Sequence, residues 1–382
     1  MFRNILKSFL AAILAVFVFY PAFVSSWVMA RQTLKSGNYK LVEKGRKVSL
    51  NIKGGGKHYP EKSWAKASSP EALGWSTEKL KLAREYSKSI GSAAVMIVVD
   101  GVVLDEWGET DKKFNVHSIR KSFLSALYGL AVKEGKIKLS STLEELGIDD
   151  NEPSLTQAEK QASVVHLLQA RSGIYHPALY ETQGMKDSKP KRGSHAPNTF
   201  WYYNNWDFNA LGTIYENAMK STIAEEFRKR VAVPLQMEDF GVEDVQYFRG
   251  ADSIHPAYPF RMTARDMARF GLLYLRAGKW RGKQIIPKKW VRESIKSYSD
   301  AGADGGYGYL WWVAVDGKLF PNVSFDKAYA ALGAGGHIIL VVPKFNLVVV
   351  HRVNTDIQGV SVTDEQSGSL LKLILDARKS GN

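Results

Sequence analysis

A serine and a lysine three residues apart, Ser118 and Lys121, have the side chains for a nucleophile and its base. A serine hydroxyl is a weak nucleophile until a base takes its proton, and a lysine buried among apolar side chains can have its pKa lowered enough to help. On one helix the two side chains share a face, because residues i and i+3 are neighbours there. The helix N-terminus also offers free N–H groups to a developing oxyanion. The chemistry that this pair would support is acyl transfer through a serine ester.

The spacing itself is common in this chain, and only its context distinguishes one copy. Ser-x-x-Lys occurs at least six times, beginning at Ser63, Ser76, Ser118, Ser188, Ser324 and Ser369. Only the copy at Ser118 opens a long apolar run, which stops at Gly135 and predicts a buried helix over residues 118–134. The alternative is that Ser118 caps this helix and that Lys121 lies in solvent.

An aromatic segment over residues 200–209 supplies a second set of groups, just ahead of a helix predicted over residues 206–218. Tyr203 offers a phenol for proton transfer, Asn205 offers an amide that can orient a substrate, and the neighbouring rings can line an acyl pocket. The alternative is an aromatic core in which Asn205 or Asp207 caps the helix.

The elements that must position these groups are strands at both ends of the chain and helices in its middle. Periodicity, caps and turns predict helices over 76–89, 224–230, 263–276, 288–297 and 368–378, and strands over 93–100, 102–107, 307–315, 337–342 and 347–353. Further caps at Ser141 with Glu144 and at Thr156 with Glu159 start helical segments. One sheet built from both ends, with a helical lobe inserted over roughly 136–260, is the simplest α+β architecture.

The chain resembles the serine beta-lactamase and penicillin-binding-protein superfamily, in the branch of class C beta-lactamases, D-alanyl-D-alanine carboxypeptidases, family VIII esterases and 6-aminohexanoate dimer hydrolase. The likeness covers residues 76–382. The superfamily's Ser-x-x-Lys matches Ser118 and Lys121, and its Tyr-x-Asn matches Tyr203 and Asn205, with Tyr202-Tyr203-Asn204 as a competing register. Supporting segments lie at residues 167–173, 263–271 and 307–312.

The resemblance implies an antiparallel sheet flanked by helices beside an all-helical lobe. It also implies a two-step mechanism with an acyl-enzyme on Ser118, in which Lys121 and Tyr203 share the proton transfers and Asn205 orients the substrate. Because Lys121 and Tyr203 would titrate together, neither can be named as the base on sequence alone. No cofactor and no metal is expected, and the histidines lack ligand spacing.

The third motif of the superfamily, Lys or His, any residue, then Gly, is where this sequence departs. The matching stretch, residues 331–337, reads Ala-Leu-Gly-Ala-Gly-Gly-His and has no cation at the first position. Gly335 and Gly336 allow close approach to a substrate, and an N–H near Gly336 or His337 would complete an oxyanion hole with that of Ser118. His337 and Arg352 are candidates to replace the cation. The alternative is simply a glycine-rich start of a strand.

In beta-lactamases and carboxypeptidases the third-motif cation helps to hold the substrate's carboxylate. Its loss here favours hydrolysis of a small-molecule ester or amide that lacks this carboxylate or bears it elsewhere. Two alternatives stay open: a catalytically silent relative that binds peptidoglycan or another envelope polymer, and a true beta-lactamase or D-amino-acid peptidase.

The first 30 residues predict export. Arg3 and Lys7 precede an apolar run over residues 9–24, and Val28-Met29-Ala30 resembles a cleavage site, so the segment is a signal peptide or a membrane anchor. The expected location is the bacterial periplasm or the outer face of the inner membrane. Residues 31–75, rich in Lys and Gly, are expected to form an extended lead-in to the domain.

The composition limits the partners. The formal net charge is +14, of which Arg3 and Lys7 supply only two units, so the exported part remains strongly basic. This charge predicts attraction to a cell-wall or anionic membrane surface, with charge spread for solubility as the alternative. No nucleic acid is expected, since no basic helix, zinc pattern or RNA-binding aromatic signature is present. The absence of cysteine excludes disulfides and thiolate metal sites.

Overall fold

The computed structural model describes residues 39–44, 47–52 and 58–379 of the chain. The export segment predicted over residues 1–30 lies outside these residues. Within them, no helix is both long and apolar enough to cross a bilayer.

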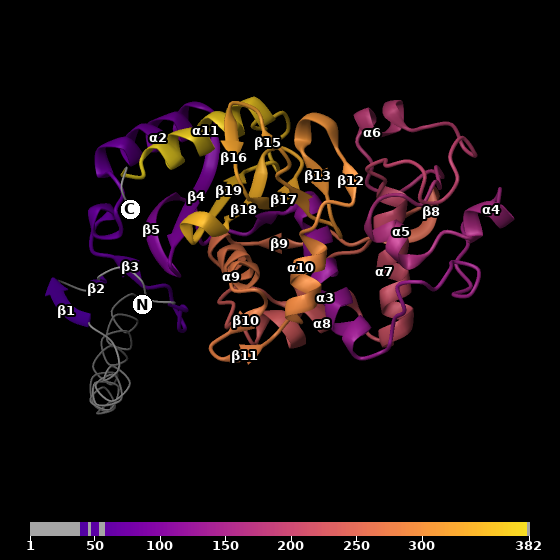
Figure 1. The fold of residues 1–382 in the computed structure, drawn as a ribbon, viewed down its shortest axis with the longest axis horizontal. Helices are drawn as coiled ribbons and strands as arrows, with labels where there is room; N and C mark the ends of the chain where they lie inside the picture. The colour runs from indigo at the N-terminus through magenta and orange to yellow at the C-terminus, as the bar shows by residue number, and fades with distance from the viewer. Residues whose placement is uncertain (1–38, 45–46, 53–57, 380–382) are drawn as a thin grey trace, which may run out of the picture.

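An eleven-stranded sheet forms the centre of the molecule (Figure 1). From one edge to the other, its strands are β1 (Tyr39–Lys44), β2 (Lys47–Ile52), β3 (Lys66–Ala67), β5 (Val102–Gly108), β4 (Ser92–Val99), β19 (Leu347–Val353), β18 (His337–Val342), β17 (Tyr329–Gly333), β14 (Trp312–Val313), β13 (Gly306–Tyr307) and β12 (Ser299–Asp300). Neighbours from β5 to β12 are antiparallel, as the resemblance implied. Among the strands that the structure describes, β3 alone pairs in parallel, with both β2 and β5.

Helices cover both faces of this sheet, which is why its central strands are almost entirely apolar. In β4, Val95 and Ile97 face the core formed with α2 (Thr77–Ser89) and α11 (Asp364–Asp376), whereas Met96 and Val98 face the core formed with α3 (Arg120–Lys133) and α9 (Ala264–Leu275). This two-residue alternation is the normal strand periodicity. Figure 1 shows α2 and α11 side by side on one face, with α9 on the other.

A mainly helical lobe lies beside the sheet at the end far from α2 (Figure 1). It contains α4 (Gln157–Lys160), α5 (Val164–Leu168), α6 (Gln183–Ser188), α7 (Asn205–Met219), α8 (Ile223–Phe227) and a π-helix over Arg228–Ala232. The lobe is not all-helical, because β7 (Phe248–Gly250) and β8 (Ser253–Ala257) form a hairpin that packs on α7. The remaining elements are β6 (Phe114–Asn115) paired with β9 (Arg261–Met262), β10 (Lys279–Trp280) with β11 (Lys283–Gln284), β15 (Gly317–Phe320) with β16 (Val323–Phe325), and α10 (Lys288–Ser294).

Three sequence predictions of elements are wrong in detail. The strand expected over 307–315 is interrupted, because the N–H of Gly308 donates to the carbonyl of Trp311 and closes a turn between β13 and β14. The cap expected at Ser141 starts no helix among the described residues, since this segment forms turns and bridges to Ser163. The last helix begins at Asp364, because Thr363 and Gln366 form a capping box ahead of the expected start.

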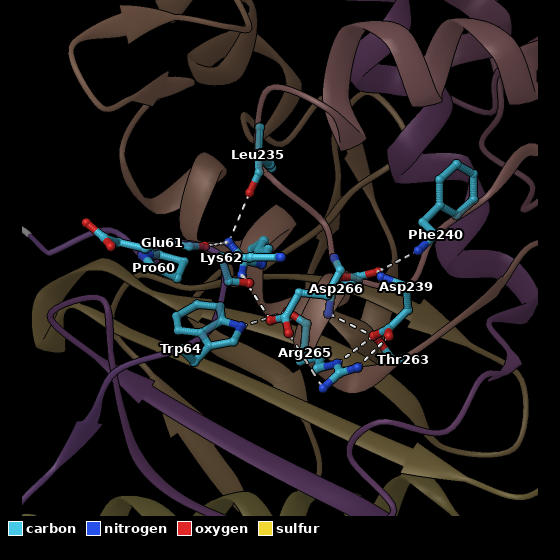
Figure 2. Close-up of polar contacts among 12 residues, drawn as sticks. Pro60, Glu61, Lys62, Trp64, Leu235, Asp239, Phe240, Thr263, Arg265 and Asp266 are labelled. Atoms are coloured by element: carbon cyan, nitrogen blue, oxygen red, sulfur yellow. Dashed lines mark hydrogen bonds and ion pairs between the residues drawn. The ribbon is translucent and has the colours of Figure 1, made fainter. Parts of the chain in front are cut away.

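Residues 58–75 pack against the domain (Figure 2). The buried guanidinium of Arg269 on α9 donates to the carbonyls of Glu61 and Lys62 at 3.0 Å each. The indole N–H of Trp64 donates to the carbonyl of Arg265 at 3.1 Å, and the Trp64 ring lies over Arg269. This segment therefore covers the N-terminal half of α9, the helix that supports the centre of the sheet.

Candidate active site

Ser118 lies in a short 3-10 turn, His117–Ile119, that leads from β6 into α3. The chain reverses sharply here: His117 has a φ of 47°, and its N–H donates to the side chain of Asn115 at 2.9 Å. A positive φ at a residue other than glycine costs free energy and is often found at functional sites. The turn presents the Ser118 hydroxyl to a cleft.

Lys121 lies on the first turn of α3 and is 2% exposed. Its Nζ is 2.8 Å from the Ser118 Oγ and 2.7 Å from the Tyr203 hydroxyl oxygen. Burial, and then the neighbouring charge of Arg120, lower the pKa of Lys121 well below the ordinary lysine value. The alternative in which Ser118 caps the helix and Lys121 lies in solvent does not hold, because Ser118 makes no capping bond and Lys121 is enclosed.

Tyr203 approaches the same point from the loop before α7. Its ring packs against Phe208 at 4.9 Å and against Trp312 at 5.2 Å between centroids, so it has little freedom to move. Burial raises the pKa of Tyr203 to about 12. The lowered pKa of Lys121 favours its neutral amine, and the raised pKa of Tyr203 favours its neutral phenol.

Asn205 is the first residue of α7, and the residue before it, Asn204, caps the helix by accepting from the N–H of Trp206. The predicted alternative, a cap at Asn205 or Asp207, is therefore wrong by one position or more. The Asn205 Nδ2 donates to the carbonyl of Tyr180 at 2.6 Å, and its buried Oδ1 has no partner among the described residues. Asn205 lines the cleft, so this oxygen is free to accept from a substrate.

The glycine-rich segment is divided between the cleft and the interior. Gly335 and Gly336 line the cleft with φ of 84° and 93°, values that glycine adopts without strain. The closest approach to the nucleophile turn is earlier, at Gly333, where a Cβ atom would lie 2.3 Å from the carbonyl oxygen of Val116. The backbone that meets the nucleophile turn is thus that of Gly333, three residues before Gly336, and Gly333 and Ala334 line the cleft as Gly335 and Gly336 do.

His337 does not line the cleft, which corrects its expected place beside the substrate. His337 is the first residue of β18, and its side chain is fully buried. Its Nδ1 accepts from the Nε of Arg352 at 3.0 Å. Arg352 is itself fully buried and donates to the carbonyls of Met262 and Phe114. Neither residue can replace the third-motif cation, because both side chains are used inside the protein.

His117 is the cleft residue that the sequence reasoning passed over. A hydrogen-bond chain runs from Arg352 to the His337 Nδ1, from the His337 Nε2 to Thr355 at 3.2 Å, and from Thr355 to the His117 Nε2 at 2.8 Å. Since Arg352 can only donate, the His337 Nδ1 accepts and its Nε2 donates to the Thr355 hydroxyl, which keeps its own proton to donate. Burial, and then Arg352, lower the pKa of His117 to about 4, so the ring is neutral. In the sequence, the signal that could have identified His117 as a cleft residue was its position directly before Ser118.

The cleft between lobe and sheet has a volume of about 790 Å³. The lobe contributes Tyr180 and the segment around Met185, and the sheet side contributes Trp312, Phe320 and Leu332. No group of histidine and carboxylate side chains suited to a metal ion occurs in the described part of the chain. The arrangement can perform acyl transfer with its own side chains: a hydroxyl, an amine, a phenol and backbone N–H groups at one end of an apolar cleft.

We expect Gly333→Ala to lower kcat/KM by about 10² because the added methyl group would meet a backbone oxygen and displace either β17 or the nucleophile turn. Gly184→Ala, on α6 at the same cleft, is the matched control, since its added methyl group meets nothing within 4 Å. The measurement is ester hydrolysis by both variants with circular dichroism as a check of folding. Equal activities would show that Gly333 does not set the geometry at Ser118.

Comparisons with known proteins show similarity over most of the chain. A family model described as Beta-lactamase matches residues 80–367. An uncharacterized protein of Alkalihalophilus pseudofirmus is 23% identical over 314 residues, covering 72% of this chain and 87% of that protein.

Three solved structures share the fold. A Bacillus anthracis protein provisionally named a 6-aminohexanoate-dimer hydrolase is 19% identical, with a TM-score of 0.57 over 77% of this chain and 80% of its own. An octameric penicillin-binding protein homologue from Pyrococcus abyssi is 18% identical, with a TM-score of 0.59 over 79% and 77%. A class C beta-lactamase is 15% identical, with a TM-score of 0.59 over 80% and 98%.

Proposed function

Since the chain belongs to the beta-lactamase family, a family of serine hydrolases, we propose that it cleaves an ester or an amide through an acyl-enzyme on Ser118. The observation that carries this proposal is the buried Lys121 amine, which lies 2.8 Å from the Ser118 hydroxyl and 2.7 Å from that of Tyr203. We also propose, from the N-terminal sequence, that the reaction takes place outside the cytoplasmic membrane.

In the first step, the neutral amine of Lys121 takes the proton of Ser118 while its Oγ bonds to the substrate carbonyl carbon. The N–H of Ser118 and a backbone N–H at Gly333 to Ala334 would stabilise the oxyanion. The protonated Lys121 then returns the proton to the leaving group through the Tyr203 phenol as the carbonyl–heteroatom bond breaks. A water molecule, deprotonated by the same pair, releases the acyl group from Ser118 and restores the hydroxyl.

The lining of the cleft favours substrates other than penicillins. None of its described lining residues is a lysine or an arginine, so a substrate carboxylate would find no fixed cation there. Trp312, Phe320 and Leu332 instead offer apolar surface to an acyl or alkyl group. A short-chain ester or an amide without a carboxylate at this position satisfies both features.

The test is to incubate the full-length protein with a fluorophosphonate, a series of p-nitrophenyl esters and a fluorescent penicillin, and to map adducts by mass spectrometry. We expect a fluorophosphonate adduct on the peptide that contains Ser118, with ester turnover that this adduct abolishes. Penicillin labelling of the same serine would replace the ester proposal by a penicillin-recognising enzyme. Folded protein with neither labelling nor turnover would contradict hydrolysis and point to a binding role.

A further inference from the structure

The cleft is acidic although the protein is basic. The chain carries 52 lysines and arginines against 38 aspartates and glutamates. The cleft lining nevertheless contains four carboxylates, those of Glu181, Asp304, Asp364 and Glu365, and no lysine or arginine. A substrate entering the cleft therefore meets a charge opposite to that of the protein as a whole.

Three of these carboxylates have no cation to balance them. Glu181 pairs with Lys189 at 2.7 Å, so its charge is compensated. Asp304, Asp364 and Glu365 are exposed at the rim and form no ion pair with any residue that the structure describes. Although all three keep contact with solvent, partial burial and then Asp364 raise the pKa of Asp304, and partial burial and then Glu365 raise that of Asp364. Hydrogen bonds from its own backbone and from Thr363 lower the pKa of Glu365. The effects of Asp364 on Asp304 and of Glu365 on Asp364 are those of like charges that repel one another.

Helix capping accounts for only part of this cluster. Asp364 and Glu365 lie in the first turn of α11, where acidic residues interact favourably with the helix dipole. Glu78 has the same place in the first turn of the neighbouring α2, outside the cleft. Asp304, however, lies in a 3-10 turn of only three residues, Gly302–Asp304, which is too short to have an appreciable dipole. Its position is therefore not explained by the dipole of its own turn.

A second acceptor lies deep in the same cleft. The Asn205 side chain is 98% buried, since its exposed fraction is 2%, and its Oδ1 has no partner. The orientation of this amide is fixed, because the carbonyl of Tyr180 can only accept and must face the Nδ2. A donor on the substrate, or a water molecule that the substrate displaces, would satisfy the free Oδ1. Both the deep end and the rim of the cleft thus present acceptors.

We propose that the preferred substrate of Ser118 carries a positive charge, such as an ammonium or guanidinium group, on the part that lies against Asp304, Asp364 and Glu365. This inference rests on the proposed serine hydrolase activity and assigns its substrate class. The cation would relieve the repulsion among the three carboxylates, and an N–H donor near the scissile bond would reach Asn205.

The test compares isosteric substrates that differ only in charge. On the acyl side, the pair is the p-nitrophenyl ester of 5-(trimethylammonio)pentanoate and that of 6,6-dimethylheptanoate, in which carbon replaces the nitrogen. On the leaving-group side, the pair is acetylthiocholine and S-(3,3-dimethylbutyl) thioacetate. Each exposed ion pair favours binding by only a few-fold, so three carboxylates predict a preference of about tenfold in kcat/KM for the cation in one pair. The preference should shrink in 0.5 M salt, as expected for exposed charges.

The double variant Asp304→Asn with Asp364→Asn should lose most of this preference, which is read as the ratio of kcat/KM for the cationic member to that for the neutral member of each pair. Glu78→Gln, the matched first-turn carboxylate outside the cleft, should keep it. Equal turnover of both members in both pairs, or a preference that survives in the double variant, would overturn the inference and leave the hydrolase proposal intact. The absence of any turnover and of any fluorophosphonate adduct would overturn both.

Discussion

Ser118→Ala and Lys121→Met are each expected to reduce ester turnover by at least about 10³-fold, and the double variant is expected to lose little more. The reason is that the two side chains act as one unit: the amine lies 2.8 Å from the hydroxyl, and neither group is reactive without the other. Initial rates with one p-nitrophenyl ester, measured for both single variants and the double variant, test this non-additivity.

The pH profile should identify Lys121 as the proton acceptor. Because burial and Arg120 lower its pKa below the ordinary value of 10.5, its neutral form is present at a lower pH than in a free lysine. The value of kcat/KM should therefore rise with pH through this lowered pKa and then stay level, since the pKa of Tyr203 is raised to about 12. A profile that rises only near pH 10.5 would contradict this assignment.

Loss of activity in Lys121→Met is not expected to result from unfolding. The native protein disfavours the charged form of this lysine, so methionine, an apolar side chain of similar length, should leave the midpoint of thermal unfolding unchanged or raise it. Tyr203→Phe is the companion variant: it keeps the ring packing, removes the phenol, and should lower kcat by about 10². A Lys121→Met protein with wild-type activity would exclude the proposed mechanism.

Local sequence signals were sufficient for the elements that are long and regular. The helices predicted over 76–89 and 263–276 are observed, and Ser76 and Thr263 cap them, because a capping side chain acts on backbone only a few residues away. The strands predicted over 337–342 and 347–353 are observed as well, since both are buried on two faces and consist almost wholly of apolar residues. The predicted fold class is confirmed by the sheet and by the family match.

The remaining features depend on contacts between distant parts of the chain. Tyr203 meets Lys121 across 82 residues, and only the family resemblance, not the spacing, brought them together before the structure. Within the lead-in predicted over residues 31–75, the carbonyls of Glu61 and Lys62 accept from Arg269, and backbone carbonyls carry no sequence signal. Asp304 lies in the same cleft lining as Asp364 and Glu365, although it is far from them in the sequence and shares no local sequence pattern with them.

Arg352 is a further residue whose role depends on contacts with distant parts of the chain and could not be predicted from the sequence. Arg352 was considered as a replacement for the third-motif cation, and the structure instead places it inside the protein, fully buried. It donates at 2.7 Å to the carbonyl of Met262, at 2.9 Å to that of Phe114 and at 3.2 Å to that of Asn115. These bonds tie β19 to the β6–β9 pair directly before the nucleophile turn.

Arg352→Met is therefore expected to lower the free energy of unfolding by about 3–5 kcal/mol, because it leaves three carbonyls and the His337 ring without their donor. Domains of this kind have a total stability of about 5–15 kcal/mol, so much of it would be lost. Urea unfolding followed by tryptophan fluorescence measures the change. Arg261→Met is the matched control: its side chain is 40% exposed and pairs with Asp356 at the surface, so its loss should cost less than about 1 kcal/mol. If the two variants unfolded at the same urea concentration, the guanidinium of Arg352 would not be what holds the nucleophile turn against the sheet.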